Sequence, residues 1–546
     1  MSVQRLEAKC VELVARRYDR YASALERAGA APQVWDALWE CMVRRNLLAV
    51  GSAERWDFGP LLRHHLRPVV SQEGGEVMAL DVSGDASGAR AAPLTLFAWL
   101  AEQITVGSVA DKELATLLAG LSELRGLEVE SAVPITDDGL LPFFNDSSLA
   151  SRLTTLRLNR NATLAGATLR RLVEACANLR ELTLTHFGCM EHITSELVHT
   201  IAHAPLHTTL TSLWLNDCSL VTDEGMGMQI QGECFLHLSP QNAGAKLRRL
   251  DFNNCPLPRP TFMYIASVCT NLQTLGLSNS PTPIDKEALT YLLQQCPHLK
   301  DLSATLATSD TLTCFERENQ LRYLYLMLLP TEVGIGQAFD DEHVRSLALG
   351  CPRLESLDLC KVSDSALWLL TSKLPSLRTL SLYIDRASDQ CRTELPTPVC
   401  LDLESLRLSC SSINGAQMHH LLSTLASSDD SADMGYRRGL KELHLTSCPN
   451  ADDEVLGWVS LCCAAALRKL ALYACPIGDR AMEVLARCFV LESLSFKKCD
   501  QVSPAAASRL VRLRRDSLLQ VFFPQGPHFR KETLALVKDL PHLRIA

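Results

Sequence analysis

Leucines recur along this chain in a short phrase that repeats at nearly constant intervals. One copy begins at Leu440 and reads Leu-Lys-Glu-Leu-His-Leu-Thr-Ser-Cys, and the next begins at Leu467 and reads Leu-Arg-Lys-Leu-Ala-Leu-Tyr-Ala-Cys. The phrase L-x-x-L-x-L-x-x-C therefore returns after 27 residues, and a fixed period of about 20–50 residues indicates a stacked repeat protein. The Leu-x-Leu pair has the period-2 spacing that places both side chains on one face of a β-strand.

Fifteen copies of this phrase follow one another from residue 124 onward. They begin at Leu124, Leu153, Leu179, Leu210, Leu247, Leu272, Leu299, Leu321, Leu354, Leu377, Leu403, Leu440, Leu467, Leu491 and Leu518. Residues 77–82 fit a degenerate earlier copy, and residues 540–545 fit a truncated last one. The spacings run from 22 to 37 residues, and the long ones predict inserted loops over 225–245, 331–342 and 427–439.

The segments between the strands have the spacing of helices. In one of them Asp285 can cap the helix start, while Leu289, Leu292 and Leu293 fall at i, i+3 and i+4. Pro297 then ends the helix. We also expect helices over 94–106 and 112–121. The predicted fold is an α/β solenoid, with a curved parallel sheet inside and helices outside.

Residues 1–70 contain no copy of the phrase. Apolar residues at helical spacing predict helices over about 6–25 and 34–42, and the group Leu61, Leu62, His65 and Leu66 suggests a third. An open solenoid end exposes apolar core, so a helical cap is expected there. We therefore divide the chain into a helical segment, 1–70, and a repeat domain, 71–546, of about 15–17 repeats.

Composition narrows the class of protein. A hydrophobic fraction of 47% and a charged fraction of 21% are those of a folded chain. A net charge of −9 disfavours nucleic acid as the main partner. The chain starts without an apolar signal segment, and no stretch approaches the ~20 apolar residues of a membrane span. We expect no membrane association and a cytoplasmic location, with the nucleus as the alternative.

The 21 cysteines do not indicate a disulfide framework. Ten of them occupy two recurring places, just before the phrase or at its ninth position: Cys176, Cys269, Cys296, Cys351 and Cys488 at the first, and Cys218, Cys255, Cys448, Cys475 and Cys499 at the second. Thiols at repeated positions behave as small buried hydrophobes. This pattern predicts free, buried thiols in a reducing compartment.

Catalytic and cofactor motifs are missing from the sequence. It contains no G-x-x-x-x-G-K-[ST], no H-E-x-x-H and no G-x-S-x-G. The cysteines lie one repeat apart, so four of them do not converge as zinc requires, and the vicinal histidine pairs do not share a helix face. We expect neither an enzyme nor a bound cofactor or metal.

The third, fifth and seventh places of each phrase are left free by the leucine packing and are expected on the concave face. The copy at Leu321 places Tyr323, Tyr325 and Met327 there. Other copies place Trp214, Tyr383, His444 and Tyr473 on the same face. Exposed aromatics are typical binding anchors, and the alternative is that loops cover them or that they pack on one another. Basic residues at the second place, such as Arg322 and Arg468, are interpreted as a solvated rim.

Over residues 75–546, the sequence patterns C-P-x-L and L-x-x-L-x-L-x-x-C resemble those of the cysteine-containing subclass of leucine-rich repeats. That subclass occurs in the substrate-binding arms of F-box proteins, and the resemblance implies a horseshoe like that of ribonuclease inhibitor. Residues 10–40 also resemble the second half of an F-box, where an aromatic-bearing helix precedes a Trp-x-x-Leu turn, although the Leu-Pro opening has no match. This second resemblance implies an adaptor contact through Tyr18, Tyr21, Trp35, Leu38 and Trp39, and the alternative is a simple cap.

The expected function is a non-catalytic scaffold that binds a protein partner on the concave face. The resemblance to F-box proteins implies one specific form, the substrate receptor of a cullin-type (SCF) ubiquitin ligase. Two alternatives use the same surface. One is a structural scaffold of a large complex, such as a cytoskeletal one, and the other is an enzyme regulator of the ribonuclease-inhibitor-like type.

Overall fold

The computed structural model describes residues 66–70, 76–82, 103–106, 111–119, 124–130, 135–159, 164–185, 197, 200–201, 204–216, 246–255, 257, 259–329, 338–386, 395–426, 439–523, 529 and 544–545. The chain divides into two compact units, Met1–Cys269 and Thr270–Ala546. We call them unit 1 and unit 2 and describe each by itself.

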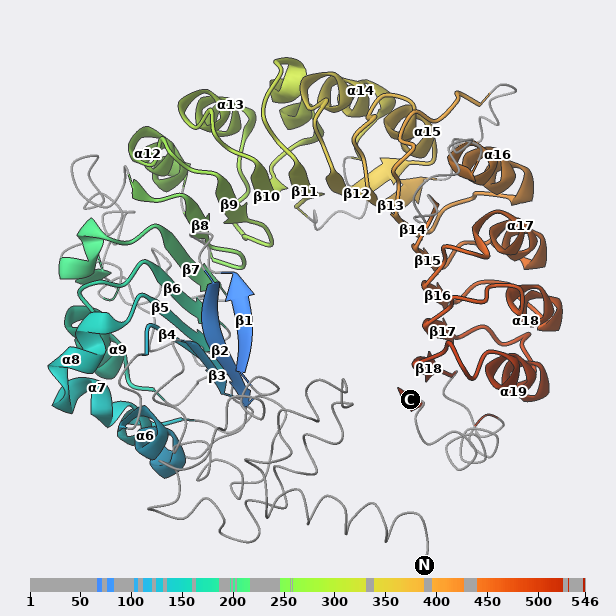
Figure 1. Cartoon of the computed structure of the whole chain (residues 1–546). Coiled ribbons are helices and arrows are strands. Elements are labelled where there is room, and N and C mark those ends of the chain that lie inside the picture. Colours follow the sequence, from blue (N-terminus) through green and yellow to red (C-terminus); the bar gives the residue numbers. More distant parts are fainter. Residues whose placement is uncertain are drawn as a thin grey trace, which may run out of the picture. The chain divides into compact units, whose positions relative to one another are not determined.

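Unit 1 contains a sheet whose first strand is antiparallel to the second, and whose later strands are all parallel (Figure 1). Its strands are β1 (Leu66–Val70), β2 (Glu76–Val82), β3 (Gln103–Val106), β4 (Gly126–Glu130), β5 (Thr155–Asn159), β6 (Glu181–Thr185), β7 (Ser212–Asn216) and β8 (Arg249–Asp251). Its helices are α6 (Asp111–Ala119), η3 (Asp137–Leu140), α7 (Leu141–Asn145), α8 (Ser147–Arg152), α9 (Gly166–Ala175), η4 (Pro205–Thr208) and α12 (Arg259–Val268).

Unit 2 contains parallel strands along the inner side of an arc and helices along the outer side (Figure 1). The strands are β9 (Thr274–Leu277), β10 (Asp301–Leu306), β11 (Tyr323–Leu328), β12 (Ser356–Ser363), β13 (Thr379–Arg386), β14 (Ser405–Ser409), β15 (Glu442–Thr446), β16 (Lys469–Tyr473), β17 (Ser493–Lys497), β18 (Gln520–Phe522) and β19 (Arg544–Ile545). The helices are α13 (Lys286–Gln295), η6 (Ser309–Glu316), α14 (Asp341–Gly350), α15 (Ser365–Thr371), α16 (Gly415–Ala426), α17 (Asp453–Cys463), α18 (Asp479–Leu485) and α19 (Pro504–Leu513).

The register of the sheet follows the repeated phrase. Each strand from β4 to β18 begins two residues after the first leucine of its copy, at the third place. The fourth-place residues Leu443 and Leu470 pair across neighbouring strands, as do the sixth-place residues Leu445 and Leu472, and all four are buried. The prediction of an α/β leucine-rich-repeat solenoid is therefore confirmed.

At the end of many strands, one residue adopts the left-handed backbone conformation, which redirects the chain away from the sheet. Among the residues that the structure describes, seven non-glycine residues have positive φ, and each is the eighth residue of its phrase: Asn254, Asn279, Lys361, Cys410, Ser447, Ala474 and Lys498. The ninth residue then enters the core. There the Sγ of Cys448 donates to the carbonyl of Leu408 in the preceding repeat at 3.5 Å, and the Sγ of Cys475 donates to that of Leu445 at 3.4 Å. The ninth place thus suits a small buried side chain that can donate one hydrogen bond.

The described cysteines are all thiols, without disulfides among them. Nine of the ten cysteines at the two recurring places are buried, and the tenth, Cys218, lies outside the described residues. Burial raises the pKa of Cys176, Cys296 and Cys351 to about 12. The prediction of buried thiols is confirmed for this set.

Two local predictions were wrong, and a third was confirmed only in part. The helix expected over 94–106 does not reach its end, because residues 103–106 form β3, whose alternating burial and β-branched Ile104 and Val106 suit a strand. Leu66, assigned to a third helix, begins β1. The copy after β10 has η6, a 3-10 helix, instead of an α-helix; only 22 residues separate the two phrases there, which leaves little room.

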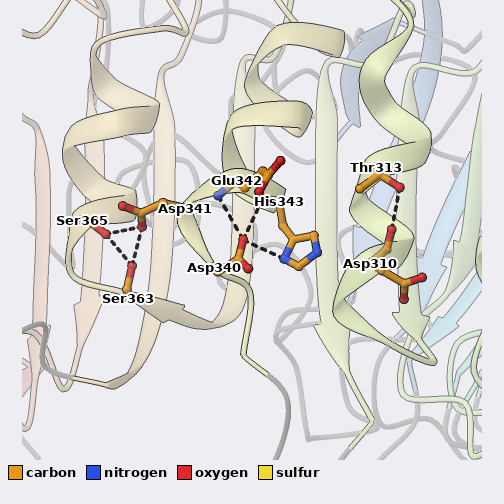
Figure 2. A network of polar contacts seen from close by, with 8 residues as sticks. All are labelled: Asp310, Thr313, Asp340, Asp341, Glu342, His343, Ser363 and Ser365. Carbon is orange, nitrogen blue, oxygen red and sulfur yellow. Dashed lines mark hydrogen bonds and ion pairs between the residues drawn. The ribbon is translucent and has the colours of Figure 1, made fainter.

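Carboxylates at the starts of helices connect neighbouring repeats. Several helices begin with an aspartate. Its carboxylate accepts hydrogen bonds from residues at the N-terminus of the helix in the next repeat. Asp453 accepts from the backbone N–H of Gly478 at 2.7 Å, and Asp479 accepts from the N–H of Ser503 at 2.6 Å. Figure 2 shows Asp341 between the hydroxyls of Ser363 and Ser365 in the same way. We call these contacts the inter-repeat aspartate bonds.

Figure 2 also shows the other kind of contact, in which an aspartate caps the helix of its own repeat. Asp340 precedes α14, and its carboxylate accepts from the backbone N–H groups of Glu342 and His343. Asp341, the next residue, points to the following repeat instead. Two consecutive aspartates therefore satisfy donors of two different helices.

Replacing Asp453 by alanine is expected to lower the free energy of unfolding by about 1 kcal/mol, because the N–H of Gly478 at the start of α18 loses its side-chain acceptor. The midpoint of urea denaturation followed by circular dichroism measures the change. Asp500→Ala, in an exposed turn, is the matched control and should change the midpoint little. Equal shifts for the two variants would contradict a role for the inter-repeat aspartate bonds.

Candidate functional site

The side chains left free by the leucine packing form rows along the inner face of unit 2. In β15, Leu443 and Leu445 are fully buried, whereas Glu442, His444 and Thr446 between them are half-buried. Neighbouring strands pair in register, so third, fifth and seventh places each form a continuous row. The inner face is therefore the surface on which the sequence can vary without disturbing the core.

The predicted aromatic group lies together on β11. Tyr323 is 48% exposed, and its hydroxyl donates to Glu355 Oε2 at 3.3 Å. Tyr325 is half-buried, and its hydroxyl donates to the sulfur of Met327 at 3.8 Å. Burial raises the pKa of both tyrosines, so both are neutral at pH 7. Some of these side chains contact one another, yet Tyr323 keeps nearly half of its surface accessible.

The other predicted residues lie apart from this group. Tyr383 is 47% exposed on β13, and Tyr473 is 36% exposed on β16 with the Lys498 ammonium 5.0 Å from its ring centre. Trp214 lies in unit 1, where it is half-buried and its Nε1 donates to Ser212 Oγ at 2.8 Å. The candidate adaptor residues Tyr18, Tyr21, Trp35, Leu38 and Trp39 lie outside the described residues. Their roles stay predictions.

His444 has an unusual environment on β15. Burial lowers the pKa of its imidazole, and the positive charge of Arg407 lowers it further, so the ring is neutral at pH 7. Its Nε2 is buried and has no hydrogen-bond partner among the described residues. His444 thus offers an unused polar atom on the inner face.

Charged residues also lie on this face: Glu442, whose place in the phrase the sequence marks as free for recognition, and Arg407, Lys469 and Asp358, which were not predicted as site residues. Glu442 accepts from Lys469 Nζ at 2.6 Å and lies 3.8 Å from Arg407 Nη2. The hydrogen bond from Lys469 lowers the pKa of Glu442. Asp358 on β12 has a raised pKa because it is buried, although a hydrogen bond with Ser381 opposes the shift. The sequence could have indicated that these residues lie on the inner face, since they occupy third and fifth places of their phrases.

The rim of the sheet carries a row of charged side chains, in which mostly exposed basic residues lie beside half-buried glutamates. Second-place basic residues pair with second-place glutamates of neighbouring repeats: Arg322 with Glu355 at 3.1 Å, Arg378 with Glu404 at 3.6 Å, Lys441 with Glu404 at 2.9 Å and Arg468 with Glu492 at 2.6 Å. Exposed pairs of this kind contribute about 0–1 kcal/mol each. The interpretation of the second place as a solvated rim is confirmed for these pairs.

The described residues contain neither a membrane-spanning helix nor a cluster of metal ligands. No helix in them is both long and apolar enough to cross a membrane. Among the same residues, no three histidine, cysteine or acidic side chains come together as metal ligands.

Comparison with known proteins adds little to this description. No family model and no curated protein matches the chain. Among solved structures, the complex of Rad7 and Elc1 in yeast is 17% identical, with a TM-score of 0.46, covering 80% of this chain and 88% of that one. A leucine-rich repeat protein of Leptospira interrogans is 15% identical, with a TM-score of 0.35, covering 83% and 91%. The fold assignment therefore rests on the strands and repeats of this chain itself.

Proposed function

We propose that this protein is a non-catalytic interaction scaffold that binds a segment of a protein partner across the inner face of unit 2. The observation that carries the proposal is the group Tyr323, Tyr325 and Met327, which lies on one strand with Tyr323 nearly half exposed. The leucine packing gives no reason for two tyrosines to occupy one strand of this face, because it leaves the third and fifth places free. A shared binding role supplies that reason.

The surroundings of this aromatic group favour docking. The neighbouring strands present shorter side chains, with Asp301 and Ser303 on β10 and Ser356 and Asp358 on β12. Two aromatic rings and a flexible thioether therefore lie between shorter, polar neighbours, with Tyr323 exposed and Tyr325 and Met327 half-buried. Buried aromatic anchors of this kind carry most of the binding energy at protein interfaces.

The double variant Tyr323→Ala, Tyr325→Ala is expected to weaken partner binding by about 2 kcal/mol, or roughly 30-fold in Kd. Affinity purification from the native cell, read by mass spectrometry, identifies the partner, and isothermal titration of the purified pair measures Kd. Tyr291→Ala, on the outer helix α13, is the matched control and should leave Kd unchanged. Unchanged affinity of a folded double variant would remove the aromatic group from the interface.

A sharper form of the proposal is that the partner is a substrate and the protein is the receptor subunit of a cullin-type ubiquitin ligase. Its support is the resemblance of residues 10–40 to the second half of an F-box, with Trp35, Leu38 and Trp39 in the Trp-x-x-Leu turn. The inner face would then hold the substrate, and residues 1–70 would hold the adaptor. The two contacts would be separable by mutation.

The variant Trp35→Ala, Trp39→Ala is expected to abolish co-purification of a cullin adaptor while keeping the partner of the inner face. Quantitative mass spectrometry of tagged full-length chains measures both in one experiment. Tyr323→Ala, Tyr325→Ala should give the reverse pattern. A wild-type chain that never recovers a cullin adaptor would refute the ligase form, and recovery of a cytoskeletal assembly or of a single inhibited enzyme would favour the corresponding alternative.

A further inference from the structure

The charges on the inner face of unit 2 are divided between its two ends. On β10 to β12, the third, fifth and seventh places hold two carboxylates, Asp301 and Asp358, and no basic residue. On β14 to β17, the same places hold Arg407, Glu442, Lys469 and Lys497, a net charge of three minus one, or +2. The eighth place adds one lysine to each end, Lys361 and Lys498, so the difference of four charges is unchanged.

The anionic end combines a carboxylate with aromatic rings. Asp358 pairs in register with Tyr325 on the neighbouring strand. Its carboxylate is hydrogen-bonded with Ser381, and the positive charge of Arg407 acts on it as well, although no ion pair joins it to a described residue within 4.0 Å. A carboxylate next to a tyrosine is a favourable environment for an ammonium or guanidinium group. This end therefore suits a lysine or arginine of the partner.

Two lysines of the cationic end, Lys497 and Lys498, lie over aromatic rings and remain available, whereas Lys469 is paired with Glu442. Lys497 Nζ lies 5.1 Å from the centre of the Phe522 ring, and Lys498 Nζ lies 5.0 Å from that of Tyr473. Both lysines are exposed, and neither has an ion pair with a described carboxylate. Stacking limits the motion of their side chains, so less entropy is lost when a carboxylate binds them.

We propose that the segment bound by the inner face has opposite charges at its two ends, with a basic side chain at Asp358 and Tyr325 and one or more carboxylates at Lys497 and Lys498. This inference rests on the proposed function and specifies the chemistry of the partner. Asp358 on β12 and Lys497 on β17 are five strands apart. At about 4.8 Å per strand, this separation is about 24 Å, which an extended chain spans in about seven residues.

The same division disfavours a nucleic acid as the ligand. A nucleic acid has a uniform negative charge, so its phosphates would be attracted to Lys497 and Lys498 and repelled by Asp301 and Asp358. A polypeptide can match both ends at once. The proposal therefore concerns a peptide segment, and an oligonucleotide serves as a competing probe.

The test uses the full chain and three fluorescein-labelled 14-residue peptides, followed by fluorescence anisotropy at low and moderate salt. The first peptide has two arginines and two glutamates separated by about seven residues, and the second has the same composition with alternating charges. In the third, the arginines are replaced by glutamine. The first peptide is expected to bind at least tenfold more tightly than the other two, with an affinity that falls as salt increases.

Two variants locate each contact on the surface. Asp358→Asn should weaken binding of the first peptide about tenfold. It should leave the affinity for the third peptide unchanged, because that peptide lacks the arginines that Asp358 would bind. Lys497→Gln should weaken binding of both the first and the third peptide, because both contain the glutamates. Arg487→Gln, which removes an exposed charge from the turn after α18, is the matched control and should change neither. A variant that had merely lost its fold would weaken all peptides alike and would be detected by circular dichroism.

Equal binding of the first and second peptides, or tighter binding of an oligothymidine than of the first peptide, would overturn the inference. So would an Asp358→Asn variant that binds all three peptides as the wild type does. The proposed function is judged separately, by the natural partner and the variant Tyr323→Ala, Tyr325→Ala. Loss of that partner in the tyrosine variant, together with no charge-order preference among the peptides, would retain the function and refute this inference alone.

Discussion

Replacing Gly350 by alanine is expected to lower the free energy of unfolding of unit 2 by about 3 kcal/mol or more. Gly350 is the last residue of α14, where the helix crosses closely over η6. A Cβ at this position would lie 1.2 Å from the carbonyl oxygen of Phe315 and 2.4 Å from its carbonyl carbon. These are backbone atoms, and the Phe315 side chain is fully buried, so neither partner can move without disrupting the core.

Gly457→Ala is the matched control for this prediction. Gly457 lies within α17, and a Cβ there would meet nothing within 4 Å. Alanine in a helix interior is favoured over glycine by about 1 kcal/mol, so this variant should be more stable than the wild type. Urea denaturation followed by circular dichroism compares the two. Changes of the same sign in both variants would contradict the close approach of α14 to η6.

Leu443→Ala is expected to cost about 2–5 kcal/mol, because it leaves a cavity under the sheet. Leu443 occupies the fourth place of its phrase, is fully buried and pairs with leucines on both neighbouring strands. The same substitution at Leu519 provides the comparison. Leu519 occupies a second place and is 60% exposed, so its replacement should change stability by about 0.5 kcal/mol or less.

Thermal and urea denaturation of both leucine variants measure this difference. The comparison tests the assignment of places within the phrase, since the two residues have the same chemistry and differ only in position. If Leu519→Ala were as destabilising as Leu443→Ala, the second place would not be a rim position.

The core of this fold was predictable because the same leucine phrase recurs in every repeat and always forms a strand. Each leucine phrase gave a strand beginning at its third place, and Asp285 caps α13 by accepting from the N–H of Ala288, as its position in the sequence indicated. The rule was weaker where repeats are atypical. The segment ending at Val106 has apolar residues that fit both helical and alternating spacing, and pairing with β2 and β4 decided in favour of the strand.

The candidate site was less predictable than the core, because its chemistry depends on neighbours one repeat away. The sequence placed Tyr323, Tyr325 and Met327 on one strand. It did not indicate that Asp358 lies beside Tyr325, or that Glu442 is shared by Arg407 and Lys469, since those contacts join residues on different strands. Exposure is equally a property of the folded surface, and it separates Tyr323 from the half-buried Tyr325.

The inter-repeat aspartate bonds also have a consequence for the order in which the chain folds during synthesis. Asp453 and Gly478 are 25 residues apart, and Asp479 and Ser503 are 24 residues apart. Each bond therefore becomes available as soon as the next repeat leaves the ribosome, without waiting for distant sequence. The solenoid can grow from its N-terminal side by adding single repeats in succession, so that at any moment only the most recently added repeat exposes its apolar end.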